Sequence, residues 1–396
     1  MKMKKWKKVV LIIMAVLVLL TAAVAYFLPV GLIIHTLWVF TKEDGHPIEV
    51  RLNDDTIHFA LNGQHMVFEA EVDGQSDSLI YDTGVNVAFV MMYTPSTQPE
   101  GMKFYLNRTT GADKKSRIKM TTFPVKWGTR RVSNIGVGFA MLNPEPSPCE
   151  KYTISKYHLL GFQGFQLSRN MIDFTASKKY TIPDSVLIDT TVFVPIKCRF
   201  NRGVLFVYPK VNGVEYECIF DTGNGNCGFL LKDEQRIENP KENDWVYEGS
   251  YGNTIGGLTE RQRFVRVPKE TFNLVGPDKE VDVSYVKDLP FHNMGLKAIS
   301  QYDWIFDWDR GGDVKVYARP HEAEEKAPVD MFQYKLNTAD GTLKILTRLI
   351  DGNEKFNVGD QIVSVNGEEI TEENICHYYD LLTENKDWSG FEIRVK

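Results

Sequence analysis

The sequence predicts a mostly β protein with two similar β lobes around a central cleft, a small α+β domain at the C-terminal end, and a transmembrane helix at the N-terminal end. Two observations predict the β lobes. Strand-like runs separated by Asn-Gly and Asp-Gly turns fill residues 46–317, and one Asp-Thr-Gly turn occurs twice among them. Turns of this kind join antiparallel strands. A third observation, the apolar run at residues 9–28, predicts the N-terminal helix.

Composition limits the classes of protein to consider. The 396 residues are enough for two or three domains, with a formal net charge of −6, so no basic surface for nucleic acid is expected. The cysteines form no Cys-x-x-Cys pair and lie near no histidine at zinc spacing. We therefore expect small core residues, rather than a disulfide framework or a metal site, at Cys149, Cys198, Cys218, Cys227 and Cys376.

The N-terminal segment, residues 1–45, is expected to hold the chain at a membrane. Lysines in the first eight residues precede the uncharged run at residues 9–28. A run of about 20 apolar residues can cross the hydrocarbon core as a helix, and the preceding lysines favour an exported body, periplasmic or extracellular. The small residues 23–25 are also compatible with a cleaved signal peptide. The apolar residues that follow, at 26–40, favour an uncleaved signal-anchor, because cleavage would leave them exposed.

The strand pattern is clearest around the Asn-Gly and Asp-Gly turns. In the first half, the strand-like runs at residues 56–61 and 66–72 are separated by Asn62-Gly63. In the second half, residues 204–211 lead into Asn212-Gly213 in the same way. Few windows have a helical period. The body of the chain is therefore predicted to be built from hairpins.

An internal repeat relates the two halves of this body. An Asp-Thr-Gly turn follows an apolar strand at residues 82–84, and a second follows another apolar strand at residues 221–223. Because one such turn is common by chance and two in the same context are not, the pair predicts two similar lobes. We place these lobes at residues 46–195 and 196–319.

Two further motifs follow each Asp-Thr-Gly turn. His158-Leu159-Leu160-Gly161 and His292-Asn293-Met294-Gly295 are 134 residues apart, and Asp173 and Asp307, each between apolar and aromatic residues, recur at the same interval. We interpret both histidines as structural, because the chemistry that a pair of carboxyls performs on water, described next, needs no imidazole. We interpret both aspartates as residues that end a strand at a turn.

The duplicated turns predict a pair of carboxyls at the interface between the lobes. Two carboxylates within a few Å cannot both ionise, so Asp82 and Asp221 would share one proton. The ionised member takes a proton from bound water, and the protonated member polarises a carbonyl group. The glycines permit the tight turn and close approach, and the threonine hydroxyls can bond across the interface. These supporting residues are Thr83, Gly84, Thr222 and Gly223.

On these turns and the downstream glycines, residues 50–320 resemble the retropepsin-like and pepsin-like aspartic peptidases. The resemblance implies two pepsin-like or retropepsin-like β lobes, a cleft between them and a hairpin flap over it. It implies that Asp82 and Asp221 are the catalytic residues of an endopeptidase that hydrolyses peptide bonds in a peptide or protein substrate. It implies no cofactor and no metal.

The sequence departs from the family pattern at three positions. Val85 and Asn224 stand where Ser, Thr or Ala is usual, so the two carboxyls need not be equivalent. Asn293 is less apolar than the pattern expects. Candidate flaps are the stretches 251–257 and 107–119, which surface loops would explain equally well.

A separate domain is expected after a polar linker at residues 320–330. Residues 331–396 contain strand-like runs, a short helix near residues 374–382, and the phrases Gly359-Asp360-Gln361-Ile362 and Val365-Asn366-Gly367. On these phrases the domain resembles the PDZ domains of bacterial proteases, which implies peptide binding by strand addition and a role in tuning substrate access. The loop near residues 332–335 lacks the usual glycines, so a domain that only braces the second lobe is the alternative.

Two other functions fit parts of the pattern. One is a catalytically inactive scaffold that binds peptides, for which loss of one aspartate would be expected. The other is a glycosidase, which also uses two carboxyls but is not built on duplicated Asp-Thr-Gly turns. An endopeptidase remains the leading prediction, with partners limited to a peptide or protein substrate, a peptide at the PDZ-like domain, and the membrane.

Overall fold

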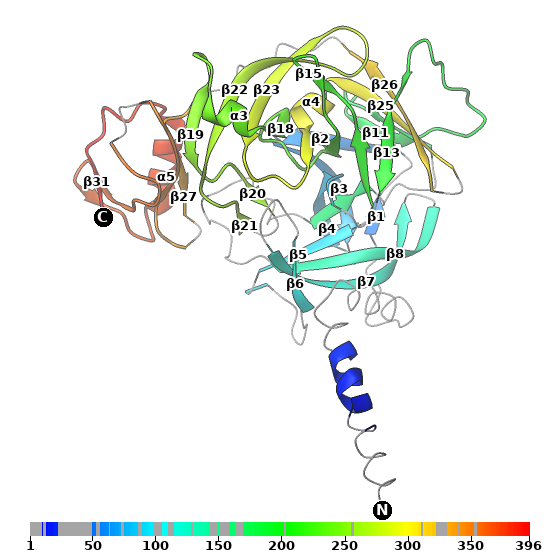
Figure 1. Cartoon of the computed structure of the whole chain (residues 1–396), viewed down its shortest axis with the longest axis horizontal. Coiled ribbons are helices and arrows are strands. Elements are labelled where there is room, and N and C mark those ends of the chain that lie inside the picture. The colour runs from blue at the N-terminus through cyan, green and yellow to red at the C-terminus, as the bar shows by residue number, and fades with distance from the viewer. Residues whose placement is uncertain are drawn as a thin grey trace, which may run out of the picture.

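The computed structural model is mostly β, as the sequence predicts (Figure 1). Within the described residues, the strands form sheets of 14 and 12 strands and two small sheets of two and three strands. Apart from the N-terminal segment, the described helices are α3 (Glu234–Glu238) and α4 (Leu296–Ile299) of the body and α5 (Ile375–Glu384) near the C-terminal end. The residues described are 10, 13–22, 50–52, 56–62, 64–72, 75–85, 89–94, 96–97, 105–109, 115–127, 130–141, 149, 158–162, 169–201, 203–254, 257–309, 312–321, 331–338, 340–351 and 355–396.

Part of the predicted N-terminal helix is described. Residues 13–22 are helical, and Figure 1 shows them apart from the sheets. Apolar side chains of this segment, such as Met14 and Leu19, are exposed. None of the helices in the described residues is both long enough and apolar enough to span a membrane. Residues 9, 11, 12 and 23–28 of the predicted span, including the alternative cleavage site, lie outside the described residues.

The first half of the body is organised around the strand that ends at Asp82. This strand, β4, pairs in parallel with β9 and antiparallel with β3. On the other side of β9 lies β5, which pairs in turn with β8. The hairpins β7–β8 and β6–β7 extend the sheet further. The strands of this half are β1 (Val50–Leu52), β2 (Thr56–Asn62), β3 (His65–Val72), β4 (Gln75–Asp82), β5 (Phe89–Tyr93), β6 (Tyr105–Thr109), β7 (Lys115–Trp127), β8 (Arg130–Met141), β9 (His158–Gly161), β10 (Asn170–Asp173) and β11 (Lys178–Thr181).

The second half repeats this pairing pattern around the strand that ends at Asp221. Here β17 pairs in parallel with β24, and β18 lies between β24 and β23 and pairs with both. The hairpins β22–β23 and β19–β22 extend the sheet further. The strands are β12 (Val194–Ile196), β13 (Cys198–Asn201), β14 (Val204–Val207), β15 (Lys210–Val211), β16 (Val214–Glu215), β17 (Cys218–Asp221), β18 (Phe229–Lys232), β19 (Trp245–Gly249), β20 (Asn253–Thr254), β21 (Gly257–Leu258), β22 (Gln262–Asn273), β23 (Lys279–Val286), β24 (His292–Gly295), β25 (Tyr302–Trp308) and β26 (Val314–Pro320).

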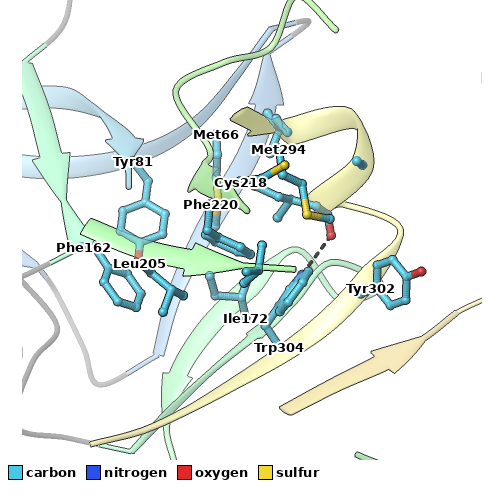
Figure 2. Packing of buried hydrophobic residues seen from close by; sticks show 14 of the residues in the cluster. Met66, Tyr81, Phe162, Ile172, Leu205, Cys218, Phe220, Met294, Tyr302 and Trp304 are labelled. Atoms are coloured by element: carbon cyan, nitrogen blue, oxygen red, sulfur yellow. Dashed lines mark hydrogen bonds between the residues drawn. The ribbon is translucent and has the colours of Figure 1, made fainter. Parts of the chain in front are cut away.

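The two halves are joined by a shared sheet and a shared core. β10 of the first half pairs antiparallel with β25 of the second. Buried aromatic rings pack where the halves meet, and the ring centroids of Phe162 in the first half and Phe306 in the second are 5.0 Å apart. Phe220 packs on Trp304 within the second half, with centroids 4.7 Å apart (Figure 2). Burial of such large side chains is the main stabilising contribution available to a β core. The apolar strands that precede the Asp-Thr-Gly turns are therefore anchored at their buried faces.

The C-terminal segment forms a small unit of four strands, a helix and a final strand, in that order. Its elements are β27 (Tyr334–Asn337), β28 (Lys344–Leu349), β29 (Ile362–Val365), β30 (Glu368–Glu369), α5 and β31 (Ile393–Val395). β28 pairs antiparallel with β19, so the 12-stranded sheet runs from the second half into this unit, at the left of Figure 1. Residues 322–330 of the predicted linker lie outside the described residues.

One expectation for the cysteines is wrong. Cys149 and Cys376 form a disulfide between the first half and α5 of the C-terminal unit, across a sequence separation of 227 residues. Nothing in their spacing indicates this bond, because only the fold brings the two residues together. Cys198, Cys218 and Cys227 are free, and the last two are buried as expected.

Candidate active site

The two Asp-Thr-Gly turns lie at the ends of equivalent strands. In the first half the parallel register aligns Asp82 with Gly161, and in the second it aligns Asp221 with Gly295. The downstream His-x-x-Gly motifs are therefore the strands that lie beside the aspartate strands. This relation explains why both motifs recur together in the sequence.

The threonines hold the two turns against each other. The hydroxyl of Thr83 accepts a hydrogen bond from the Thr222 N–H at 2.9 Å and donates one to the Phe220 carbonyl at 2.6 Å. The hydroxyl of Thr222 accepts from the Thr83 N–H at 3.1 Å and donates to the Tyr81 carbonyl at 2.6 Å. Both threonines are completely buried. The cross-interface bonding predicted for these residues is present in the structure.

The glycines of the turns leave room for the opposite carboxyl. A Cβ atom on Gly84 would lie 2.7 Å from the carboxyl carbon of Asp221, and a Cβ atom on Gly223 would lie 2.4 Å from that of Asp82. Neither distance is compatible with a side chain. Each glycine N–H also donates to the carboxyl of its own turn at 2.9 Å, Gly84 to Asp82 and Gly223 to Asp221.

The carboxyls of Asp82 and Asp221 are brought toward each other, because each lies against the glycine of the opposite turn. Burial, followed by the charge of Asp221, raises the pKa of Asp82 well above its usual value. Burial also raises the pKa of Asp221, whereas hydrogen bonds from Asn293 and from Asp82 act in the opposite direction. Such a pair retains one proton over a wide pH range.

Asn293 is a site residue that sequence reasoning did not assign. Its side-chain amide donates to Oδ2 of Asp221. Asn224, which directly follows the second Asp-Thr-Gly turn, donates from Nδ2 to Oδ1 of Asn293 at 2.8 Å. The signal was present, because position 293 is polar where the corresponding position of the first motif is Leu159.

The other recurring residues have structural partners. Nδ1 of His158 accepts from the Met92 N–H, and Nδ1 of His292 accepts from the Lys232 N–H, both at 3.1 Å. These bonds tie each His-x-x-Gly strand to the neighbouring strand, in keeping with the structural role predicted for the histidines. Asp173 ends β10 and accepts from the Ala176 N–H, as expected of a turn. Asp307 differs, because it lies inside β25 and pairs with Arg169.

The two candidate flaps belong to equivalent hairpins. Residues 251–257 lie between β19 and β22 and overlap the small β20–β21 hairpin, in which Asn253 pairs with Leu258; residues 255 and 256 lie outside the described residues. Residues 107–119 belong to the β6–β7 hairpin, whose tip at 110–114 lies outside the described residues. In the second half β22 pairs next with β23, and in the first half β7 pairs next with β8. The two hairpins therefore occupy corresponding positions in the two halves.

Comparison with known proteins gives little independent information. No family model and no curated protein matches the chain. Among solved structures, the chain is similar to a retropepsin-like aspartic protease from Rickettsia conorii, with 14% sequence identity and a TM-score of 0.22. The matched region covers 32% of this chain and 89% of the other.

Proposed function

We propose that this protein is an aspartic endopeptidase whose catalytic residues are Asp82 and Asp221. The observation that carries the proposal is the placement of the two carboxyls at the ends of equivalent strands, each against the glycine of the opposite turn. Thr83 and Thr222 keep the turns in place through bonds that cross between the halves. The two halves would be the two lobes of the enzyme, at residues 46–195 and 196–319, with the substrate in the cleft between them.

The chemistry follows from a carboxyl pair with one proton. The ionised carboxylate removes a proton from a bound water molecule, and the water oxygen forms a bond to the carbonyl carbon of the peptide. The protonated carboxyl gives its proton to the carbonyl oxygen, so the intermediate is a neutral diol and the pair has exchanged roles. Transfer of a proton to the amide nitrogen then allows the C–N bond to break. No cofactor takes part in these steps.

The close approach of the two Asp-Thr-Gly turns argues against a glycosidase. Retaining and inverting glycosidases need carboxyls about 5–5.5 Å and about 6.5–9.5 Å apart, to leave room for the sugar or for water. Here each carboxyl lies against the glycine of the opposite turn, and the bonds between Thr83 and Thr222 hold the two turns together. The inactive peptide-binding scaffold remains the alternative, and both aspartates with their complete set of supporting bonds favour the enzyme.

The C-terminal unit, residues 331–396, is proposed to be a PDZ-like domain that tunes substrate access through the β19–β22 hairpin. β28 pairs with β19 from Tyr247 to Gly249, and the Thr347 hydroxyl donates to the Ser250 carbonyl at 2.7 Å. Gly249 and Ser250 lead directly into the β20–β21 hairpin, a candidate flap. A peptide bound at the unit would therefore act on a strand that continues toward the flap.

The proposed location is a membrane, with residues 46–396 outside the cytoplasm. Two observations support it. The apolar side chains of residues 13–22 are exposed in the described helix, which follows a lysine-rich start. The disulfide between Cys149 and Cys376 is of a kind that persists in the periplasm and extracellular space rather than in the reducing cytosol. N-terminal sequencing of the mature protein tests the retained anchor against the alternative start near residue 26.

The function is tested by cleavage of an unfolded protein substrate by the purified full-length chain in detergent. The expected result is peptide-bond cleavage that pepstatin inhibits and that metal chelators and serine- or cysteine-directed reagents do not. Binding of the substrate without cleavage, across the acidic and neutral pH range, would instead support the inactive scaffold.

A further inference from the structure

The pseudo-symmetry of the carboxyl pair is broken at one position. In the parallel register Leu159 lies opposite Ile80, two residues before Asp82, and Asn293 lies opposite Ile219, two residues before Asp221. Leu159 and Asn293 therefore occupy the same place in the two halves. Leu159 is a buried apolar residue, whereas the amide of Asn293 donates to Oδ2 of Asp221. Only the second aspartate receives a side-chain amide from this position.

A chain of hydrogen bonds fixes the direction of this amide. The Asn226 N–H donates to Oδ1 of Asn224 at 3.3 Å, and Nδ2 of Asn224 donates to Oδ1 of Asn293 at 2.8 Å. A backbone N–H can only donate, so the first bond orients the Asn224 amide, and Asn224 in turn orients the Asn293 amide. The Asn293 nitrogen is thus left to face the carboxyl of Asp221.

The other contacts of the two carboxyls are matched. Each accepts from the glycine N–H of its own turn at the same distance, 2.9 Å, and each lies against the glycine of the other turn. A donated hydrogen bond stabilises a carboxylate more than a neutral carboxyl, because the bond is charge-assisted. The unmatched donor, Asn293, therefore favours the negative charge on one side of the pair.

Charged groups near the second turn hold Asn226, where this series of hydrogen bonds begins. Lys297 of α4 and Arg266 of β22 both donate to the Asn226 carbonyl, at 3.1 Å and 3.0 Å, and both pair with the buried Asp282 of β23. The charge that acts on Asp82 is that of Asp221. The asymmetry of the pair therefore originates in a neutral amide, whose position the ionic cluster helps to fix.

We propose that Asn293, oriented by Asn224, is a positioning residue that places the negative charge on Asp221 and the shared proton on Asp82. In the proposed peptidase, on which the catalytic meaning of this assignment rests, Asp221 removes the proton from water and Asp82 protonates the carbonyl oxygen. The raised pKa of Asp82 and the lowering effect of Asn293 on the pKa of Asp221 agree with this assignment.

The test is a pH titration of the full-length chain in detergent, with isotope-labelled aspartate carboxyl carbons followed by NMR. Asp82→Asn and Asp221→Asn assign the two signals. We expect Asp221 to ionise first in the unsubstituted chain. In Asn293→Leu, which copies Leu159, the first ionisation of the pair should move up by about one to two pH units, the value of a charge-assisted hydrogen bond. Asn224→Ala should move it in the same direction by less.

The control is Asn239→Leu, on the exposed end of α3, which should leave the ionisation unchanged. Earlier ionisation of Asp82 than of Asp221, or an unchanged first ionisation in both Asn293→Leu and Asn224→Ala, would overturn the proposal. If Asn293→Leu does not fold, Asn224→Ala carries the test. The titration needs no turnover, so it gives its answer even if the protein proves to be an inactive scaffold. If the protein is active, the acidic limb of kcat/KM should shift with the titration.

Discussion

Thr83 and Thr222 each accept a hydrogen bond from the other's backbone N–H through the side-chain hydroxyl. Each hydroxyl also donates to a carbonyl of the opposite half, so the four bonds are related by the same approximate two-fold symmetry as the strands. The bonds join residues that directly follow Asp82 and Asp221. The separation of the two carboxyls is therefore determined by this completely buried network rather than by the carboxyls themselves.

Replacing Thr222 with Val should damage stability and activity together. Val keeps the shape of Thr but removes the buried hydroxyl that accepts from the Thr83 N–H and donates to the Tyr81 carbonyl. An unsatisfied buried group costs about 1–3 kcal/mol. We expect at least this loss in the free energy of urea unfolding, and a loss of roughly tenfold or more in kcat/KM from misplaced carboxyls. Thr222→Ser, which retains the hydroxyl, should keep most of both. Equal behaviour of the two variants would show that the hydroxyl network is not what aligns the pair.

Gly223→Ala should remove activity, because its added methyl would lie 2.4 Å from the Asp82 carboxyl carbon. The turn or the carboxyl must move, and overpacking of this kind costs about 1–3 kcal/mol. Gly390→Ala is the matched control, since nothing lies within 4 Å of its added Cβ atom. Cleavage rates and thermal melting of both variants check the prediction. Full activity in Gly223→Ala would mean that the two turns are not in close contact.

The carboxyl pair should make stability depend on pH in an unusual direction. Burial and Asp221 raise the pKa of Asp82 in the folded protein, so the native state binds its proton more tightly than the unfolded state does. The stabilisation from this tighter proton binding is fully present below the pKa of Asp82 in the unfolded chain, about 3.9. It is lost as the pH rises through the pKa of Asp82 in the folded protein. A tenfold difference in proton affinity between the two states corresponds to about 1.4 kcal/mol of unfolding free energy.

Asp82→Asn has no carboxyl at this position, so it does not lose this stabilisation as the pH rises. The unfolding free energy of the variant minus that of the unsubstituted chain should therefore increase from pH 4 to pH 7. Denaturant titrations at several pH values measure the difference. A difference that does not change with pH would contradict the raised pKa of Asp82.

Reduction of the disulfide should destabilise the C-terminal unit. Cys149 and Cys376 close a loop of 227 residues, and long closed loops stabilise by about 2–5 kcal/mol through the unfolded state. Cys376→Ser should therefore lower the unfolding free energy by about this amount and abolish its sensitivity to reductant. Cys198→Ser, at a free cysteine, should remain sensitive to reductant. A reductant-insensitive unsubstituted chain would argue against the bond.

Removal of residues 328–396 should affect the β19–β22 hairpin as well as binding of long substrates. The deletion exposes the edge of β19 and removes the ring of Phe332, which stacks on Tyr247 with centroids 4.5 Å apart. We expect faster amide hydrogen exchange in residues 245–262 and lower activity on short peptides too. A milder variant, Thr347→Val, removes only the hydroxyl that bonds to the Ser250 carbonyl.

Unchanged exchange and unchanged short-peptide activity in the deletion would separate the C-terminal unit from the hairpin. In that case its effect would be confined to capture of long substrates, which a rise in KM for a protein substrate would reveal.

Patterns of adjacent residues predicted most of the fold. The hairpin at Asn62 and the strands before Asp82 and Asp221 follow from alternation and turn chemistry, and the repeat predicted that the halves correspond. The disulfide of Cys149 with Cys376 and the pairing of β28 with β19 were not predicted, because both depend on residues that only the tertiary fold brings together.

The site was predicted in part for the same reason. Asp82, Asp221 and their threonines and glycines lie in two short motifs, so the sequence alone identifies them. The role of Asn293 depends on the register between β17 and β24, which places its side chain beside Asp221. Sequence reasoning noted the unusual polarity of Asn293 but had no means of locating its partner.

The most direct test of the account compares Asp82→Asn and Asp221→Asn with the unsubstituted chain in one cleavage assay on an unfolded protein, with thermal melting of each variant measured in parallel. An amide can neither share the proton nor accept one from water, so each substitution should abolish cleavage while the fold is kept. Substantial cleavage by either folded variant would contradict the account, because another group would then have to perform the chemistry.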